Sequence, residues 1–342
     1  MITRTHDTRT HRARGRFARD AAGSAVALVA GLVAGLSTLF AVSPAAAQPM
    51  GDDEHEPARP MLVSESAGLV AGATNNIALT FDIDEGWHVY WPGQNDTGFA
   101  PSLELTLPEG WTASDIQWPA PHRHVSPGGI LDHVYEDGEA TFIIPITVPS
   151  DAEVGPVTIT ADAEWLVCRE ACIPGWQTVT LETRVVPANA RVGASEFSPR
   201  FEEARTRHAE PYTINPHPRR LQPTRWATLK WQGGDLQVSA VVPPNDAGRK
   251  PVSLAFYPDA GGSLVQNLLK TGESTGDASR APAPLFLKRA DPTKPISGII
   301  EVRFLDKSRP ALYRIESRPL NESNTAQSDS QRPDPNQPDP DG

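Results

Sequence analysis

Alternating apolar residues, broken at short intervals by glycine, proline and aspartate, constrain the fold of this chain most strongly. In Asn76–Ile83 every second residue is a large apolar one, and Ser102–Leu107 repeats the pattern before Pro108. Such alternation places the apolar side chains on one face of a strand, and turn residues between short strands are typical of an antiparallel sandwich. Proline accounts for 34 of the 342 residues, about twice its usual share, and a proline inside a helix costs about 3 kcal/mol. The chain is therefore expected to be all-β.

Two blocks of such runs predict two β-sandwich domains, at residues 61–187 and 220–318. The strands expected in the first block are Asn76–Ile83, Trp87–Trp91, Ser102–Leu107, Ala140–Val148, Val157–Ala163, Trp165–Val167 and Gln177–Val186. Those expected in the second block are Trp226–Trp231, Leu236–Val242, Val252–Tyr257, Pro284–Lys288, Gly298–Leu305 and Ala311–Ile315.

The segments around the second block have a different composition. Residues 188–219 are expected to form a linker with one short helix, which Ser198 would cap and in which Pro199 would be the first residue. Residues 319–342 are rich in Asn, Ser, Gln and Asp-Pro pairs. They hold too little apolar surface to bury, so we expect this tail to be disordered.

The first 47 residues are expected to be a signal peptide. Six arginines occur within the first 20 residues, an uncharged stretch runs from Ala21 to Met50, and small residues precede Gln48. A basic region, an apolar region and a small-residue site are typical of secretory signals, and we expect cleavage after Ala47. Residues 48–60 would then be a flexible leader. An uncleaved membrane anchor is the alternative, because the apolar run is nearly long enough to cross a bilayer.

The charge of the chain excludes one class of function. The signal peptide carries six basic and two acidic residues, so its removal changes the formal net charge from −11 to −15. Such a surface repels nucleic acid, and no nucleic-acid partner is expected. No later segment is long and apolar enough to cross a membrane, so we expect no membrane span after signal cleavage. An exported chain enters an oxidising compartment, in which two cysteines form a disulfide by default.

Cys168 and Cys172 are the two cysteines, and β-forming residues stand on both sides of them. A tight turn at Arg169–Ala171 would place them opposite each other on adjacent strands, within disulfide range, whereas a helix would hold their Cβ atoms too far apart. A bond that closes so short a loop contributes only about 2 kcal/mol. Arg169 would favour a thiolate here and Glu170 would oppose it. From the spacing alone, a structural hairpin disulfide and an exchangeable one both remain open.

The residues around the pair are more specific. Trp165-Leu166-Val167-Cys168, Cys172-Ile173-Pro174, Gly86–Trp91 and Asp96-Thr97-Gly98 together resemble the N-terminal periplasmic domain of the DsbD/ScsB family of disulfide reductases. Phe256-Tyr257-Pro258-Asp259 and Ser297-Gly298-Ile299-Ile300 look like the downstream half of the same region. The resemblance covers about residues 60–316. Three residues between the cysteines are what the ScsB-like branch has.

The resemblance implies a fold and a function. The fold would be two immunoglobulin-like sandwiches, and Cys168 and Cys172 would be a redox pair that takes electrons from a membrane partner and passes them to periplasmic thiol-disulfide proteins. His122–His133, with His122 and His124 in it, would be a cap loop that shields the pair and hinges at Gly128 and Gly129. Tyr90 and Trp165 would surround the pair.

The same resemblance implies a reductase activity only if another protein supplies the electrons. The membrane domain and the thioredoxin-like domain of the family are absent from the sequence, so a protein-disulfide reductase activity would need a separate membrane electron donor. No cofactor is expected.

Other constellations suggest weaker hypotheses. His122, His124 and His133 lie close in sequence, and with two thiols they could bind copper or zinc, although solvated histidines are the simpler interpretation. Asp82, Asp84 and Glu85 are expected to be solvated, and without a Ser/His/Asp grouping we expect no hydrolase. The alternatives to thiol-disulfide exchange are therefore a non-catalytic adaptor with a structural disulfide and a copper-handling protein.

Overall fold

The computed structural model describes residues 56–315, except 213–224, 233, 244, 245 and 247. The expected signal peptide, its cleavage site and the expected C-terminal tail lie outside the described residues. None of the described helices is long and apolar enough to cross a membrane.

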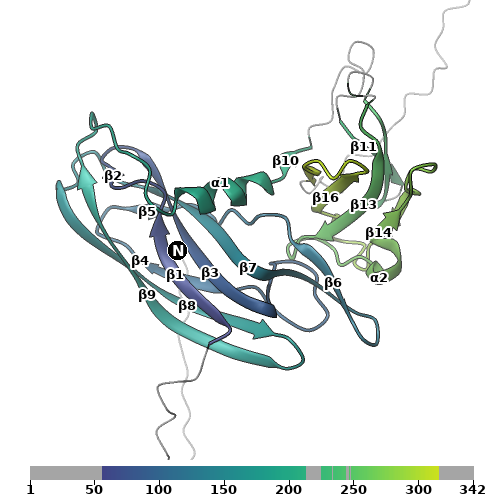
Figure 1. Ribbon diagram of the computed structural model, residues 1–342, viewed down its shortest axis with the longest axis horizontal. Coiled ribbons are helices and arrows are strands. Elements are labelled where there is room, and N and C mark those ends of the chain that lie inside the picture. Colours follow the sequence, from purple (N-terminus) through teal and green to yellow (C-terminus); the bar gives the residue numbers. More distant parts are fainter. Residues whose placement is uncertain (1–55, 213–224, 233, 244–245, 247, 316–342) are drawn as a thin grey trace, which may run out of the picture. The chain divides into compact units, whose positions relative to one another are not determined.

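Nine strands make up the N-terminal half (Figure 1). They are β1 (Ala58–Ser64), β2 (Leu69–Val70), β3 (Thr74–Tyr90), β4 (Ser102–Thr106), β5 (Thr112–Ala113), β6 (His122–Ser126), β7 (Ile130–Thr147), β8 (Gly155–Cys168) and β9 (Cys172–Val186). Hydrogen bonds join β1, β3, β7 and β5 in one layer and β4, β8, β9 and β2 in the other. The end of β3 also pairs with the end of β8, so the two layers meet at the cysteines.

The alternation that predicted the strands places the core between the layers. On β8 the apolar residues from Ile159 to Val167 are buried at every second position. Trp165 lies with its ring centre 5.3 Å from that of Phe81, which is 6.1 Å from that of Phe142 on β7. The all-β prediction is confirmed.

Several strand boundaries differ from the prediction, and two of the differences involve β1 and β3. The expected leader is wrong at its end, because β1 begins at Ala58 and pairs with β3. Pro60 is tolerated there since β1 is an edge strand. Asn76–Ile83 and Trp87–Trp91, expected as separate strands, belong to one bent strand up to Tyr90. The register shifts between Ile83 and His88, where Gly86 has a φ of 77°, a conformation that favours glycine.

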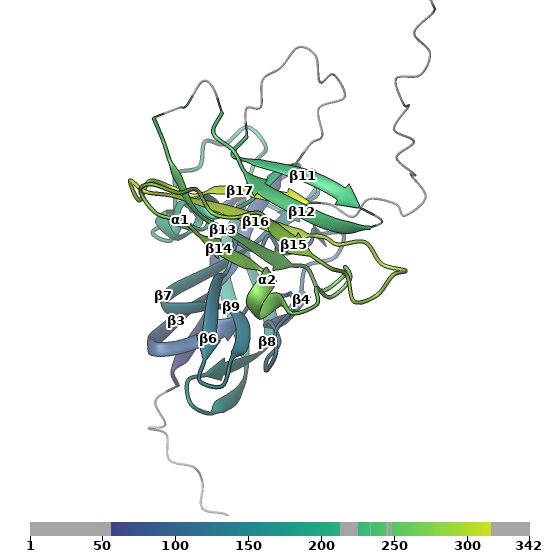
Figure 2. The ribbon, with the colours of Figure 1, turned by 90° about the vertical axis from the view of Figure 1, so that its right-hand side faces the viewer.

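The C-terminal half contains two further sheets, seen as separate layers in Figure 2. One comprises β10 (Glu210–Pro211), β17 (Ala311–Ile315), β16 (Gly298–Phe304), β13 (Pro251–Pro258) and β14 (Glu273–Thr275). The other comprises β11 (Ala227–Gln232), β12 (Asp235–Ala240) and β15 (Leu285–Leu287). The six strands predicted in this region are present, whereas β10, β14 and the short helix α2 (Leu268–Thr271) were not predicted.

The linker helix is confirmed as α1 (Ser198–Thr206), but its predicted cap is wrong. Phe197 occupies the N-cap position and makes no side-chain cap bond. The backbone N–H of Phe197 instead donates to Oγ of Ser195, which satisfies one of the free donors at this helix end. Burial of Phe201 and Ala204 against the N-terminal sandwich fixes the helix.

The larger C-terminal sheet is buried on both faces. Because side chains alternate along a strand, Leu254 and Phe256 of β13 pack in the core of the C-terminal half, while Ala255 and Tyr257 pack with the core of the N-terminal half. The two halves therefore share this sheet.

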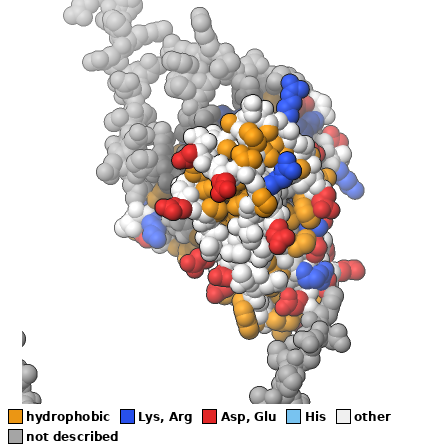
Figure 3. Space-filling view, turned by 90° about the vertical axis from the view of Figure 1, so that its left-hand side faces the viewer, with side chains coloured by type: hydrophobic (Ala, Val, Ile, Leu, Met, Phe, Trp, Pro, Cys, Tyr) orange, Lys and Arg blue, Asp and Glu red, His pale blue; other side chains and the backbone are white. Residues whose placement is uncertain are grey.

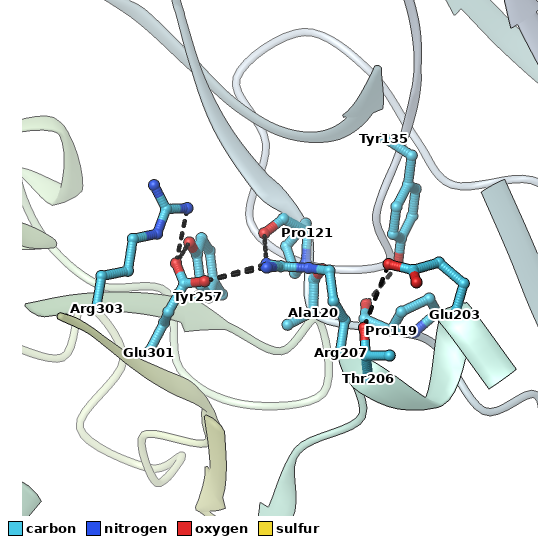
Figure 4. A network of polar contacts seen from close by, with 10 residues as sticks. All are labelled: Pro119, Ala120, Pro121, Tyr135, Glu203, Thr206, Arg207, Tyr257, Glu301 and Arg303. Atoms are coloured by element: carbon cyan, nitrogen blue, oxygen red, sulfur yellow. Dashed lines mark hydrogen bonds and ion pairs between the residues drawn. The ribbon is translucent and has the colours of Figure 1, made fainter. Parts of the chain in front are cut away.

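A buried carboxylate joins the halves (Figure 4). Arg207, just beyond α1, donates to the carbonyls of Ala120 and Pro121 and lies 3.2 Å from Oε1 of Glu301. Glu301 is 1% exposed and also receives bonds from Arg303 at 2.9 Å and from the Tyr257 hydroxyl at 2.5 Å. Burial raises the pKa of Glu301, but Arg207, Arg303 and Tyr257 outweigh it and hold that pKa below its usual value.

Candidate functional site

The disulfide closes a hairpin between β8 and β9. Cys168 lies directly opposite Cys172, with Arg169–Ala171 as the turn, and the two Cα atoms are 4.1 Å apart. The predicted cross-strand disulfide is confirmed. The two cysteine residues differ in exposure, because Cys168 is 3% exposed whereas Cys172 is exposed. A second molecule can therefore reach Cys172 first.

The buried side of the bond is a small apolar cluster. Cys168 packs with Tyr90 and Val134, and the half-buried Leu166 covers them. The Tyr90 hydroxyl oxygen lies 3.7 Å from Sγ of Cys172 and 3.1 Å from Oγ1 of Thr97. Tyr90 therefore lies against both cysteines of the disulfide.

A chain of hydrogen bonds through Thr97 to Asp132 holds the Tyr90 hydroxyl in place. Thr97 donates its only hydroxyl hydrogen to Oδ2 of Asp132 at 2.6 Å, so the Tyr90 hydroxyl donates to Thr97. The other carboxylate oxygen of Asp132 accepts the backbone N–H groups of Asp96 and Thr97. Desolvation raises the pKa of Tyr90, so this phenol stays protonated. In the reduced protein its one hydrogen can turn from Thr97 to a thiolate at Cys172, because the hydroxyl oxygen lies within 3.7 Å of that sulfur.

Thr97 and Asp132 were missed as functional residues. Asp96-Thr97-Gly98 carried part of the family resemblance, but its role was not predicted. The structure explains Gly98, because a Cβ there would lie 2.1 Å from the Tyr90 ring. Asp132 is 2% exposed and lies 35 residues from Thr97 in the sequence, so only the fold brings them together.

The expected cap loop, His122–His133, is a β-hairpin made by β6 and the start of β7. Gly128 and Gly129 form its turn, with φ of 92° and 81°, which explains both glycines without a hinge. The hairpin packs beside Cys168: the His124 ring lies 4.8 Å from the His88 ring, and His88 pairs with Cys168 across β3 and β8. It leaves Cys172 exposed, so the expected shielding is corrected to one sulfur.

The C-terminal half holds the segments that surround the pair. Arg123 of the hairpin donates to the Leu269 carbonyl at 2.5 Å, and its Nε lies 3.2 Å from Glu273. Gln94, in the segment that contains Thr97, exchanges two hydrogen bonds with the backbone of Val265. Both segments are thus anchored outside the N-terminal sandwich.

The three histidines of the hairpin lie in different surroundings. His122 and His124 share a face of β6, as expected for an extended segment. His133 is buried, donates through Nδ1 to the Gln94 carbonyl at 2.7 Å, and has its pKa lowered to about 4 by desolvation. No group of three His, Cys, Asp or Glu side chains among the described residues is placed to hold a metal ion. The geometry gives the copper-handling hypothesis no support.

Other residues that the sequence singled out pack in the core or make contacts that stabilise the fold. Trp165 lies in the core, on the opposite face of β8 from Cys168, and Gly175 makes room for its ring. The Arg169 guanidinium lies 5.0 Å from the centre of the Trp87 ring. The expectation that Asp82 and Asp84 are merely solvated is corrected, since they lie 3.0 Å and 2.9 Å from guanidinium nitrogens of Arg200 and Arg59 respectively.

A groove of about 840 Å³ lies at the opposite end of β8 from the disulfide. Its lining includes Val154, Leu181 and Phe197. Figure 3 faces this end of the sandwich, where hydrophobic side chains gather among acidic and basic ones. The groove contains no part of the sulfur site.

Residues 58–183 match the family model described as the N-terminal domain of thiol:disulfide interchange protein DsbD. This segment contains the hairpin disulfide and the side chains that surround it. Residues 58–183 belong to the DsbD N-terminal family. No curated protein matches the chain.

Solved structures include similar folds. The N-terminal periplasmic domain of ScsB from Proteus mirabilis is 15% identical and covers 80% of this chain and 96% of its own, with a TM-score of 0.48. The DsbD N-terminal domain of Neisseria meningitidis in the reduced form is also 15% identical. It covers 39% of this chain and 88% of its own, with a TM-score of 0.23.

Within this DsbD N-terminal domain, Tyr90→Phe is expected to raise the thiol pKa of Cys172 in the reduced protein by about one unit. A hydrogen bond to an anion contributes about 1.5 kcal/mol or more, and one pKa unit corresponds to about 1.4 kcal/mol. Thiolate absorbance followed against pH measures the change. Tyr135→Phe is the matched control, because its hydroxyl donates to the Pro119 carbonyl instead. Equal titrations for Tyr90→Phe and the control would exclude the role of Tyr90.

Proposed function

We propose that this protein is an exported thiol–disulfide exchange protein that relays electrons through Cys168 and Cys172. One observation carries the proposal: in a DsbD N-terminal domain, the exposed residue Cys172 is disulfide-bonded to the buried residue Cys168. The exposed residue is the point of contact with a partner, and the buried residue completes the reaction.

The chemistry balances as a two-electron transfer. In the reduced protein the Cys172 thiolate attacks a disulfide of the client, forms a mixed disulfide and releases one client sulfur as a thiolate, which takes a proton. The Cys168 thiolate then attacks Sγ of Cys172, the mixed disulfide breaks, and the second client sulfur leaves and is protonated. The client gains two electrons and two protons, and the Cys168–Cys172 bond forms again.

Two partners follow from this cycle. A separate membrane protein would supply electrons by attacking Cys172 of the oxidised form, and periplasmic thiol-disulfide proteins would receive them. The periplasm is the proposed location, which fits the basic and apolar N-terminal segment. No cofactor is needed, because sulfur exchange carries the electrons.

The reduction potential of the pair tests the proposal. An exchange protein is expected to have a value of about −200 mV, whereas structural disulfides lie below about −300 mV. Equilibration of the full chain with glutathione buffers, followed by thiol alkylation and mass measurement, gives the potential. A value below about −300 mV would assign the bond to the structural alternative and reject the relay.

A further inference from the structure

The outer surface of the layer that carries the disulfide is open to solvent. Because side chains alternate along a strand, Cys172, Pro174 and Trp176 of β9 point to this side, and all three are exposed. Cross-strand neighbours share it: Glu164 of β8 pairs with Trp176, and Asp162 pairs with Thr178. We call this surface, which also includes Glu104 of β4, the disulfide face; its members are Cys172, Pro174, Trp176, Glu104, Asp162 and Glu164.

Trp176 is the feature of the disulfide face that the fold does not explain. Its neighbour Gly175 faces the core and admits the Trp165 ring, whereas Trp176 is 75% exposed. An exposed tryptophan keeps a large apolar area in water, and tryptophan is among the residues that contribute most to protein interfaces. It lies four positions after Cys172, about 13 Å along a strand. A partner bonded to Cys172 covers that distance within one interface of ordinary size.

The charge of the disulfide face is negative. Glu104 pairs with Asp162 across β4 and β8, and Glu164 lies two residues further along β8; all three side chains are exposed. The outward residues of β9 from Cys172 to Glu182 include no lysine or arginine. A cationic surface complements this face, and a second copy of the same face is repelled by it.

We propose that the disulfide face is the docking surface for a protein whose reactive cysteine stands beside apolar residues and is flanked by lysine or arginine. The apolar residues would pack on Trp176 and Pro174, and the cations would face Glu104, Asp162 and Glu164. The inference rests on the proposed function, because the partner's thiolate attacks Sγ of Cys172 and displaces the Cys168 thiolate.

The test uses the oxidised full chain and three probe thiols. One probe is glutathione. The others are two peptides with a single cysteine next to leucines, one carrying three lysines and the other three glutamates. At low salt the lysine peptide is expected to react about tenfold faster than the glutamate peptide, and added salt should reduce the difference. Glu104→Gln/Asp162→Asn/Glu164→Gln should abolish the difference, and Trp176→Ala should slow both peptides severalfold.

A matched triple variant controls for net charge. Glu109→Gln/Asp151→Asn/Glu153→Gln changes the charge equally, but Asp151 and Glu153 lie beyond the opposite end of β8 from Cys168. It should keep the preference for the lysine peptide. Glutathione, which is itself anionic, should react equally with the unmodified chain and with Trp176→Ala, because these two carry the same charge. Equal rates of the two peptides with the unmodified chain, loss of the preference in the control variant, or an equal slowing of glutathione by Trp176→Ala would overturn the docking face. Failure of all three thiols to react would instead reject the exchange function itself.

Discussion

Cys168→Ser is expected to trap mixed disulfides, and Cys172→Ser is expected to trap almost none. In the first variant the exposed Cys172 keeps its thiol and attacks a client disulfide, and no second cysteine remains to release the client. In the second variant the remaining thiol belongs to Cys168, which is 3% exposed beneath Tyr90 and Leu166. An opening that costs about 3 kcal/mol makes its reaction about a hundredfold slower.

Glutathione disulfide is a suitable reporter for this experiment, because it is small and needs no docking surface. The rate of glutathione addition to each reduced variant, followed by mass spectrometry, gives the ratio directly. Cys168→Ser/Cys172→Ser is the control for reaction at other side chains. Similar rates in the two single variants would contradict the division between an attacking and a resolving sulfur.

Arg207→Ala is expected to cost about 3 kcal/mol of unfolding free energy. The substitution removes bonds to the Ala120 and Pro121 carbonyls and one partner of the buried Glu301 carboxylate. A buried charge that loses its partner stays desolvated without compensation, which accounts for the large effect. Denaturation in urea at neutral pH measures the loss.

Arg303→Ala is the matched control, since Arg303 pairs with the same carboxylate but its side chain is 46% exposed. In that variant the Glu301 carboxylate keeps Arg207 and Tyr257, and water can reach the place of the half-exposed guanidinium, so the loss is expected to be smaller. The pKa of Glu301 is lowered in the folded protein, so its stabilisation is complete above the usual pKa of a glutamate and is lost as the pH falls through the folded value. The acid-dependent loss should therefore be smaller in Arg207→Ala. An equal cost for the two variants would contradict the bridging role of Arg207.

The C-terminal half also contributes to the disulfide site, because it binds two of the segments that surround the cysteines. It holds Arg123 of the hairpin beside Cys168 and Gln94 of the segment that carries Thr97. Leu131, next to Asp132, packs in the C-terminal core. The hydrogen-bond chain from the Tyr90 hydroxyl through Thr97 to Asp132 therefore depends on packing in both halves.

Patterns among neighbouring residues predicted the longer strands and the cysteine hairpin, because local backbone geometry determines both. The period-two pattern on β8 and the apolar runs of β13, β16 and β17 identified strands, because alternation along a strand depends on neighbouring residues alone. The cysteine hairpin followed in the same way, since its turn closes within five residues. The short strands β2, β5 and β10 were missed, because two residues of backbone pairing leave no periodic signal.

Contacts between segments that are distant in the sequence account for the features that were not predicted. Thr97 meets Asp132 across 35 residues, and Arg207 meets Glu301 across 94. The same kind of contact makes a hairpin of the stretch expected to be a loop, by pairing β6 with the start of β7.

The amino-acid sequence by itself determined that the chain is all-β, that its single cysteine pair closes a hairpin, and that the surrounding residues resemble a disulfide-exchange family. The tertiary structure alone decided which cysteine residue is exposed, which hydroxyl lies beside the disulfide, and which face of the sheet stays open to solvent. Burial explains this division. The exposure of Cys168 and Cys172 depends on what packs over β8 from β3, β7 and the segment around Thr97, and no pattern within the hairpin records that packing.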